Sequence, residues 1–407
     1  MNRNLSMKSN PMNVLNRWLY VVLGIVIMIC LGTVYSYSVF RIPIEAHFKV
    51  GTLQSGIPYM TALAFYAFFM FLTGRHLDKF NPKFVMILGG VLVSLGWLAS
   101  AYAINIYILT ITYGVISGAG VGIVYGVPMT VVARWFPEKK GLAVGMVLIG
   151  FGLSPLITAP LARTFVEEFG IMNTFQILGI CFGILIPLLS LPFKYPSESE
   201  MLRYKSVKQV SNRINEFNTS SMIRTKSFKA LYFNFIIGTT IGLMLIGLTS
   251  SVGTELIGLS PKRVALLMVL FAIFNGIGRP IFGWLTDKLS SKRAMYLSYS
   301  LIITSAVLVL FAGEGTILIY TISFSIFWFN LGGWLAIAPT STLALYGTKH
   351  YSQNYGVVFT AYGIGAVTGV VTSGILIDLH QNYHYVFYYI IALCLVGILS
   401  TTQLSDN

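Results

Sequence analysis

An arginine lies inside an otherwise uncharged apolar stretch of the sequence. From Val264 to Thr286, a stretch that contains FNGIGRPIFG, Arg279 is the only charged residue. An arginine at the centre of a bilayer costs roughly 2.5–3.5 kcal/mol on insertion scales, so a charge at this depth usually has a function. A guanidinium can hold a carboxylate through two parallel hydrogen bonds. The position therefore favours an anion-binding role over a structural arginine satisfied by carbonyl oxygens of a neighbouring helix.

Three uncharged side chains are expected to share the depth or the face of this arginine. Asn275 precedes Arg279 by one helical turn and so lies on the same face. Tyr125 and Tyr362 lie far enough from the charged ends of their spans to reach the same depth. A tyrosine hydroxyl at that depth needs a hydrogen-bond partner, which favours a position that faces a cavity.

Three further candidates lie on the first and the tenth apolar stretches of the chain, Trp18–Phe40 and Thr316–Ala338. Tyr35 is close to the outer end of the first stretch, where membership of an aromatic belt is an equal alternative. Asn330 and Trp334 are four residues apart on the tenth stretch and share a face, although Trp334 could serve only in packing. These three complete a substrate-binding set that centres on Arg279.

The elements that position these residues are membrane-spanning helices. Of the 407 residues, 56% are hydrophobic and 10% are charged, and the mean hydropathy is +0.76, a composition typical of membrane proteins. A bilayer core of about 30 Å is crossed by roughly 20 helical residues. Long apolar runs indicate helices, because strand barrels show short alternating segments. The sequence predicts an all-α polytopic membrane protein with twelve transmembrane helices: Trp18–Phe40, Leu53–Thr73, Phe84–Ile104, Tyr107–Ala133, Gly141–Ala162, Thr174–Phe193, Ala230–Thr254, Val264–Thr286, Ala294–Ala312, Thr316–Ala338, Tyr355–Ile377 and Tyr385–Thr402.

The net charge of +14 is distributed unevenly between the loops. With the N-terminus in the cytoplasm, the inner segments hold 21 of the 27 Lys and Arg residues, and Arg279 lies inside a span. This is the positive-inside pattern, which predicts that both termini are cytoplasmic. Because topology explains the basic charge, we expect a lipid bilayer and no nucleic acid as the partner. The outer loops hold the remaining five: Arg41, Lys49, Arg163, Lys262 and Arg263.

The chain divides into two halves that resemble each other. Residues 194–229 are basic and polar and predict a cytoplasmic linker between an N-terminal half, residues 1–193, and a C-terminal half, residues 230–407. GRHLDKFNPK after the second span matches GWLTDKLSSK after the eighth at an offset of 209 residues, and GFG in the fifth span matches GIG in the eleventh at an offset of 213. The nearly constant offset predicts two pseudo-symmetric six-helix bundles with a site at their interface near the midplane.

The G-x-x-x-D-K loops resemble the signature of the major facilitator superfamily, and the resemblance extends from Trp18 to about Thr402. Within it, GTVYSYSVF, RWFPEKKGLAVG, FNGIGRPIFGWLTDK and NYGVVFTAYGIGA are similar to the oxalate/formate antiporter family, which neighbours the monocarboxylate (lactate and pyruvate) transporters. The resemblance implies a secondary transporter that works by alternating access, with Arg279 matching the arginine that binds the substrate carboxylate. It also implies a cytoplasmic gate formed by Gly74, Asp78, Lys79, Gly283, Asp287, Lys288 and Arg134.

Two positions depart from the pattern of these families. Animal monocarboxylate transporters carry an aspartate where this chain has Asn275, and no predicted span contains Asp or Glu. This argues against a proton site in the protein, and proton symport and anion exchange both stay open. The oxalate transporter that the chain resembles carries a second cation, a lysine, where this chain has Tyr362. One cation would leave the second carboxylate of a dianion uncompensated. We expect a small monocarboxylate such as lactate, pyruvate or formate, with an oxalate/formate-type antiporter as the alternative.

Other classes of function fit the sequence less well. His380, His384 and Asp378 have a spacing that could bind a metal, but histidines in such loops are usually only solvated. GIGAVTG resembles a dinucleotide fingerprint, but no strand precedes it. A receptor role would not explain the internal repeat together with a lone midplane cation. We expect a monomeric, multi-pass protein of the plasma membrane that is not an enzyme and uses no cofactor or metal.

Overall fold

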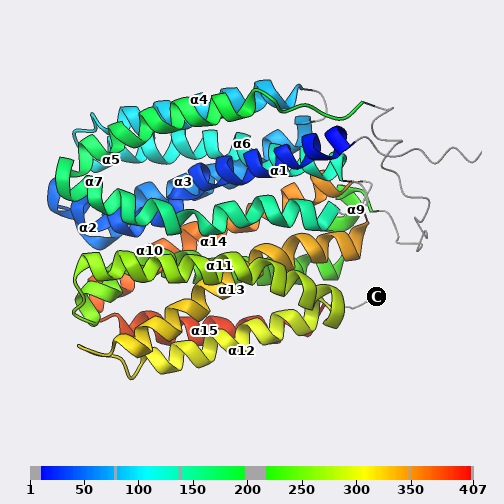
Figure 1. Cartoon of the computed structure of the whole chain (residues 1–407). Coiled ribbons are helices and arrows are strands. Elements are labelled where there is room, and N and C mark those ends of the chain that lie inside the picture. Colours follow the sequence, from blue (N-terminus) through cyan, green and yellow to red (C-terminus); the bar gives the residue numbers. More distant parts are fainter. Residues whose placement is uncertain (1–10, 78–79, 137–139, 198–216, 348–349, 405–407) are drawn as a thin grey trace, which may run out of the picture.

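The first half of the chain folds as a bundle of helices (Figure 1). The computed structural model describes residues 11–77, 80–136, 140–197, 217–347 and 350–404, and contains helices and no strand among them. Up to residue 197 the helices, in chain order, are α1 (Pro11–Leu31), the 3₁₀ turn η1 (Gly32–Ser36), α2 (Tyr37–Phe48), α3 (Thr52–His76), α4 (Pro82–Ser100), α5 (Ile106–Leu109), the π-helical η3 (Thr110–Ser117), α6 (Gly118–Trp135) and α7 (Lys140–Ser190).

The second half begins with a short helix and then forms a second bundle. The start of α11 shows why the helices begin where they do: the hydroxyl of Ser260 accepts a hydrogen bond from the backbone N–H of Arg263, and Pro261 takes the first helical position. From residue 217 on the helices are α9 (Thr219–Ile223), α10 (Lys226–Ser251), the π-helical η4 (Val252–Leu256), α11 (Pro261–Leu289), α12 (Ser291–Val309), α13 (Ile317–Tyr346), α14 (Tyr351–His380) and α15 (His384–Thr401).

The helices account for the predicted membrane spans. In the described part of the chain, ten helical segments are long and apolar enough to cross a membrane. One of them, residues 143–190 of α7, contains the fifth and sixth predicted spans, which are separated by a break at Gly170, where φ is +77°. A positive φ is accessible to glycine because it has no Cβ. The ninth predicted span corresponds to α12, so the twelve predicted spans each have a helical counterpart.

The prediction for the end of the first span was wrong. The span was expected to stop at Phe40 and to leave Arg41 in an outer loop, but the helical segment continues through η1 and α2 to Phe48. Arg41 and Glu45 therefore belong to the helix, and the side chain of Arg41 is buried. The same helical segment therefore also contains a carboxylate, that of Glu45, beyond the predicted end of the span.

The two bundles meet mainly along two pairs of helices, α3 with α14 and α7 with α11, and α2 also contacts α10. One glycine of each of the repeated motifs GFG and GIG lies at one of these interfaces. A Cβ added at Gly363 of α14 would lie 2.9 Å from the Cβ of Ala67 on α3. A Cβ added at Gly152 of α7 would lie 2.7 Å from the side-chain oxygen of Asn275 on α11. Glycine at these positions thus permits the helices of the two halves to approach closely.

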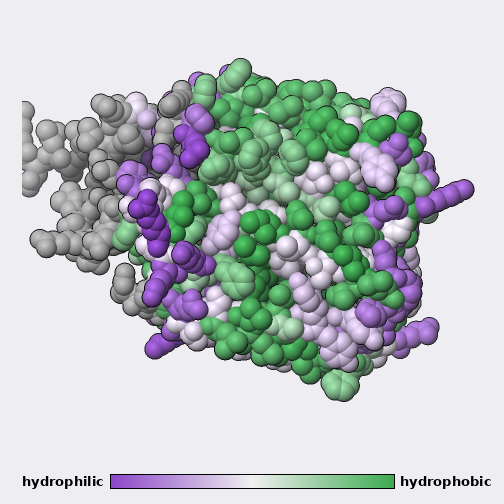
Figure 2. All heavy atoms as spheres, turned by 180° about the vertical axis from the view of Figure 1, so that it is seen from behind, coloured by the Kyte–Doolittle hydropathy of each residue, from purple (hydrophilic) through white to green (hydrophobic). Residues whose placement is uncertain are grey.

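The surface has an apolar middle and two hydrophilic ends. Figure 2 shows hydrophobic side chains over the middle of one face and hydrophilic side chains toward both ends. Exposed hydrophobic residues away from the ends of their helices include Val22, Val91, Ile277 and Leu395. The start of α1, helix α9 and the C-terminal end of the chain lie at one end of the bundle (Figure 1), which we name the terminal end. The opposite end, which contains α2, is named the distal end.

Candidate substrate-binding site

Arg279 is a buried cation at the interface between the two bundles. Its side chain lies on α11, and the residue is only 4% exposed. Nη1 donates to the backbone oxygen of Leu148 on α7 at 2.8 Å, and Nη2 donates to the side-chain oxygen of Asn275 at 3.4 Å. Nε is buried and has no acceptor in the part of the chain that the structure describes. None of the ion pairs in the described part of the chain involves Arg279, so its contacts there are with uncharged groups.

Asn275 fixes the position of the guanidinium. Its side-chain nitrogen donates to the backbone oxygen of Trp328 on α13 at 2.9 Å, which leaves its oxygen to face Arg279. The residue is fully buried. The prediction that Asn275 and Arg279 share a face is confirmed by this contact. Asn275 therefore both joins α11 to α13 and orients the cation.

Two glycines bring α7 against the site. A Cβ at Gly152 would lie 3.1 Å from Nε of Arg279, and a Cβ at Gly276 would lie 2.7 Å from Leu153. Real Cβ atoms essentially never come within 3.0 Å of an atom on another helix, so a side chain at Gly276 would force the side chain of Leu153 to move. This close approach allows the carbonyl of Leu148 to reach Arg279.

Aromatic side chains from both bundles surround the arginine. The ring of Phe151 lies 6.0 Å from Cζ of Arg279 and packs edge-on against Tyr35 and Tyr125 at centroid distances of 5.0 and 5.2 Å. The hydroxyl groups of these two tyrosines lie close enough to Arg279 to interact with its positive charge. The hydroxyl of Tyr35 lies 3.0 Å from the hydroxyl of Tyr362, which joins η1 in the first bundle to α14 in the second. The structure thus gathers Tyr35, Tyr125 and Tyr362 around Arg279.

Three aromatic residues of this cluster were missed in the sequence. Tyr66 on α3 packs against Tyr125 at 5.0 Å and against Tyr362 at 5.4 Å. Phe359 stacks on Tyr362 at 4.9 Å, and Phe151 forms the wall next to Arg279. The depth argument that singled out Tyr125 applies equally to Tyr66. The two phenylalanines carry no polar group and gave no comparable signal.

Asn330 and Trp334 lie on the face of α13 that packs against α12, and not on the face that meets Asn275. The side chain of Asn330 accepts from Ser298 of α12 at 2.7 Å and donates to the backbone oxygen of Ile326 at 2.8 Å. The ring of Trp334 packs against Tyr299 of α12 at 5.2 Å and fills the space above Gly238 of α10. Both side chains therefore face the interior of the second bundle and do not join the cluster around Arg279.

The residues of the expected gate lie at the terminal end, as far as the structure describes them. Asp78 and Lys79 fall outside the described residues. Asp287 and Lys288 are exposed in the last turns of α11, after Gly283, and Gly74 lies near the end of α3. The guanidinium of Arg134 lies 4.1 Å from the ring centroid of Tyr195. The gate stays a prediction.

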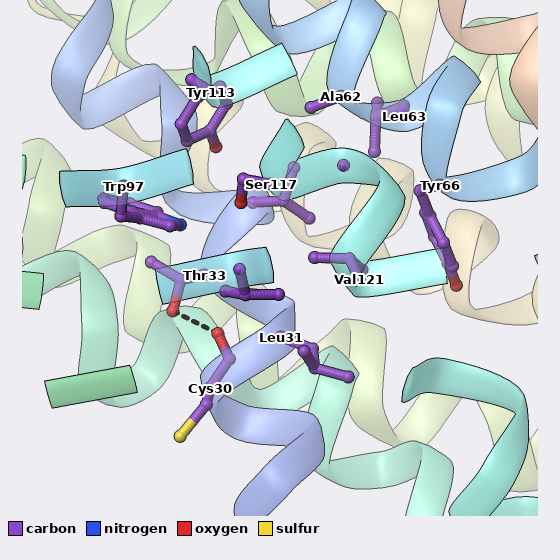
Figure 3. Close-up of a pocket in the computed structure, with 13 residues that line it drawn as sticks. Cys30, Leu31, Thr33, Ala62, Leu63, Tyr66, Trp97, Tyr113, Ser117 and Val121 are labelled. Carbon is purple, nitrogen blue, oxygen red and sulfur yellow. Dashed lines mark hydrogen bonds between the residues drawn. The ribbon is translucent and has the colours of Figure 1, made fainter. Parts of the chain in front are cut away.

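A small cavity lies inside the first bundle and not at Arg279 (Figure 3). Figure 3 shows the rings of Trp97 and Tyr113 on one side of it and Tyr66 on the other. The hydroxyl of Thr33 at its edge already donates to the backbone oxygen of Cys30 at 2.9 Å. Its lining is mostly apolar and holds no charged residue, so it has no group that would select an anion.

The loop histidines do not form a metal site. Within the described residues there is no group of three His, Cys, Asp or Glu side chains that could hold a metal ion. His384 has both ring nitrogens near acceptors, at 2.8 Å from the side-chain oxygen of Asn382 and 3.1 Å from the backbone oxygen of Ala312. The ring of His380 stacks on Tyr385 at 3.9 Å. These contacts give the two histidines a structural role.

The sequence is similar to those of known transport proteins. The chain is 29% identical over 358 residues to the oxalate:formate antiporter of Oxalobacter formigenes, a match that covers 87% of this chain and 83% of that protein. It is 27% identical over 324 residues to monocarboxylate transporter 12 of Xenopus laevis, covering 75% of this chain and 70% of that protein. These similarities span both bundles.

The fold and the family model agree. A crystal structure of a bacterial homolog of the human lysosomal transporter Spinster superposes with a TM-score of 0.66 at 14% sequence identity, covering 98% of this chain and 95% of that chain. At this identity the match concerns the fold alone. The family model of the Major Facilitator Superfamily matches residues 21–350. The chain is therefore a transporter and not an enzyme, and it belongs to the Major Facilitator Superfamily.

Proposed function

We propose that the protein is a secondary active transporter of small monocarboxylates, such as lactate, pyruvate or formate, and that Arg279 anchors the carboxylate. The proposal rests on the burial and the hydrogen-bond partners of Arg279. It is buried, its hydrogen-bond partners are uncharged, and Nε has no acceptor among the described residues. An unpaired buried charge costs several kcal/mol, and a carboxylate ligand would offset that cost. The similarity to carboxylate transporters supports the same substrate class.

The walls of the site support a small substrate with a single charge. Arg279 is the one cation among the described residues that contacts the aromatic cluster. Tyr362 is fully buried and offers a hydroxyl beside Tyr35, where a lysine would supply a second positive charge. The second carboxylate of oxalate would lose its hydration without gaining a cation, at a cost of several kcal/mol. We expect a preference for monocarboxylate of about a hundredfold or more.

The site also fits alternating access between two halves. Arg279 and Asn275 come from the second bundle, whereas Phe151, Tyr35 and Tyr125 come from the first. Movement of one bundle against the other would open the site to one side at a time. We propose that residues 1–193 and 230–407 move as the two halves, with residues 194–229 as the linker, and that the protein works as a monomer.

The charge distribution supports an orientation in the plasma membrane with the terminal end in the cytoplasm. Arg17, Arg75, Lys194, Lys226 and Lys292 lie near that end of their helices, in keeping with the positive-inside pattern. The gate proposed from the family resemblance would then close the cytoplasmic side. The charge on the distal end is smaller, which agrees with an outer face.

The second candidate is exchange of oxalate and formate. It is favoured by the 29% identity to the oxalate:formate antiporter over 83% of that protein. The two candidates share Arg279 and differ in what the site does with a second carboxylate. Coupling to a proton and coupling to a counter-anion are both compatible with the site.

Counterflow in proteoliposomes tests the proposal. The purified protein is reconstituted with internal unlabelled L-lactate, and entry of labelled L-lactate is followed with and without an imposed pH gradient. We expect saturable entry that oxalate inhibits weakly. In matched vesicles without internal lactate, accumulation driven by a proton gradient would establish symport, and entry only when an internal anion is present would establish exchange. Absence of any carboxylate entry would refute the proposed function, and stronger competition by oxalate would favour the second candidate.

A further inference from the structure

A second arginine is buried between the bundles at the distal end. Arg41 on α2 is 3% exposed. Within the first bundle, its Nε donates to the hydroxyl of Ser55 at 3.1 Å and its Nη2 donates to the backbone oxygen of Thr52 at 2.6 Å. Glu45, one turn further along α2, lies 3.5 Å from Nε and accepts from Ser55 at 2.5 Å. The first bundle alone thus holds the guanidinium in place.

Two donors of the first bundle reach across to α10 of the second. Nη1 of Arg41 donates to the backbone oxygen of Gly247 at 3.1 Å. The hydroxyl of Tyr59 on α3 donates to the backbone oxygen of Leu243 at 3.3 Å. The two acceptors are one helical turn apart, about 6 Å at 1.5 Å per residue. A Cβ at Gly247 would lie 3.2 Å from the ring of Tyr59, so a glycine gives this ring room at the interface.

Separation of the bundles at this end would leave these two donors without acceptors. The contacts of Arg41 to Ser55, Thr52 and Glu45 lie within the first bundle and would persist. Nη1 of Arg41 and the hydroxyl of Tyr59 would lose their oxygen acceptors on α10, and the hydroxyl of Ser38 would lose only a weak acceptor, the sulfur of Met268 on α11 at 3.7 Å. The carbonyls of α10 would lose less, because they already accept hydrogen bonds within their helix. The opened surface would therefore present one cationic and one neutral donor, about one helical turn apart.

This arrangement is suited to a carboxylate. A carboxylate has two oxygens that accept hydrogen bonds, and a bond to a guanidinium is among the strong ones. We propose that Arg41 and Tyr59 form an outer carboxylate-binding site, in which the carbonyls of Leu243 and Gly247 take the place of the substrate when the distal end is closed. The inference rests on the proposed function and orientation, and assigns the substrate a first binding position on its way to Arg279.

Competition between substrate and α10 follows from this assignment. The same two donors cannot serve the carboxylate and the carbonyls together. An anion bound there holds the distal end open, and the end closes when the anion moves on to Arg279 or returns to the medium. Two bonds that only closed the gate would act differently, since weakening them would favour the open state and improve apparent affinity from the distal side. The two roles therefore predict opposite signs.

Sided transport kinetics of the full-length protein distinguish the two roles. In proteoliposomes of uniform orientation, the KM for labelled L-lactate is measured separately from the distal and the terminal side. Tyr59→Phe removes one donor, and the double variant Arg41→Met with Glu45→Gln removes the cation without leaving a lone charge. We expect the distal KM to rise severalfold in the first and about tenfold or more in the second, with the terminal KM within about twofold of the wild type.

Matched controls come from the same end of the molecule. Tyr37 stacks on Tyr59 at 5.3 Å, but its hydroxyl donates to the backbone oxygen of Ser55 within its own bundle at 2.7 Å. Tyr37→Phe therefore loses a bond of the same kind and should leave the ratio of the two KM values unchanged. Arg163 pairs with Glu167 at 2.8 Å with the same spacing but on an exposed surface, so Arg163→Met with Glu167→Gln controls for loss of a distal charge.

The results separate this inference from the function on which it rests. An unchanged or lowered distal KM in the Tyr59 and Arg41 variants would overturn the outer site and leave a gate contact. A distal KM that rises equally in the Tyr37 control would also overturn it, because the effect would then be structural. Failure of the proposed function is recognised differently, by absence of lactate transport in the wild type. If the double variant does not fold, Tyr59→Phe against Tyr37→Phe decides the question.

Discussion

Replacement of Asn275 by aspartate would place a negative charge directly beside Arg279. The side-chain oxygen of Asn275 lies 3.4 Å from Nη2 of the arginine. At that distance and an effective dielectric constant of about 20, opposite unit charges attract by about 5 kcal/mol. The new carboxylate would compete with the substrate for the same cation. Even half of this energy would raise the KM for L-lactate about fiftyfold or more.

The effect of Asn275→Asp should depend on pH. A protonated carboxyl carries no charge and can donate to the backbone oxygen of Trp328, as the amide of Asn275 does at 2.9 Å. The cation would then be available to the substrate. Residue 275 is fully buried, and burial disfavours the ionised carboxyl against the attraction of Arg279. Transport by the variant should therefore be retained at acid pH and lost as the pH rises and the carboxyl ionises. In proteoliposomes with equal pH on both sides, initial rates of L-lactate entry between about pH 5 and pH 8 test this.

Asn275→Ala is the matched control for this prediction. It loses both hydrogen bonds of the Asn275 side chain and introduces no charge, so its rates should be reduced without a new dependence on pH. Identical pH profiles of the aspartate and alanine variants would refute the reasoning. That result would mean that residue 275 does not control the charge that the substrate meets.

Three further substitutions test separate parts of the site. Gly152→Ala would place a Cβ 2.7 Å from the oxygen of Asn275 and 3.1 Å from Nε of Arg279, and because overpacking of this kind costs about 1–3 kcal/mol, L-lactate uptake should fall about tenfold or more. Gly145→Ala on the same helix, where a Cβ would have nothing within 4 Å, should keep the wild-type rate. Equal rates in the two variants would argue against close contact of α7 with the site. Tyr362→Lys should improve inhibition of L-lactate entry by oxalate, and no gain would show that Tyr362 does not face the substrate. Tyr35→Phe removes the contact at 3.0 Å to Tyr362 and should raise the KM severalfold, since a neutral hydrogen bond is worth about 0.5–1.5 kcal/mol; a wild-type KM would place its hydroxyl outside the binding site.

The fold could be predicted from the sequence because its signals are long and repeated. Apolar runs, charged loops and the matching motifs at nearly constant offset each cover many residues. The end of the first helix could not be predicted, because a charged residue such as Arg41 marks the end of an apolar run in the sequence. Its burial depends on Thr52, Ser55 and Gly247, which are distant or on another helix. Tertiary contacts of this kind leave no local trace in the sequence.

The site could be predicted only in part, because a sequence gives depth along a helix more readily than direction. Arg279 and Asn275 were assigned to one face from their spacing, and the structure brings them together. Asn330 and Trp334 also share a face, but that face packs on α12. Helix α13 is apolar on all sides, so its hydrophobic pattern does not indicate which face lines the interface.

The central claim is that the planar guanidinium of Arg279 anchors a carboxylate. The most direct measurement is equilibrium binding of labelled L-lactate to the purified full-length protein, in the wild type and in Arg279→Lys. Lysine keeps the charge but loses the two-pronged geometry, so the Kd should rise about tenfold or more while the unfolding temperature changes little. Arg163→Lys on the exposed surface should bind as the wild type does. A wild-type Kd in Arg279→Lys would contradict the claim.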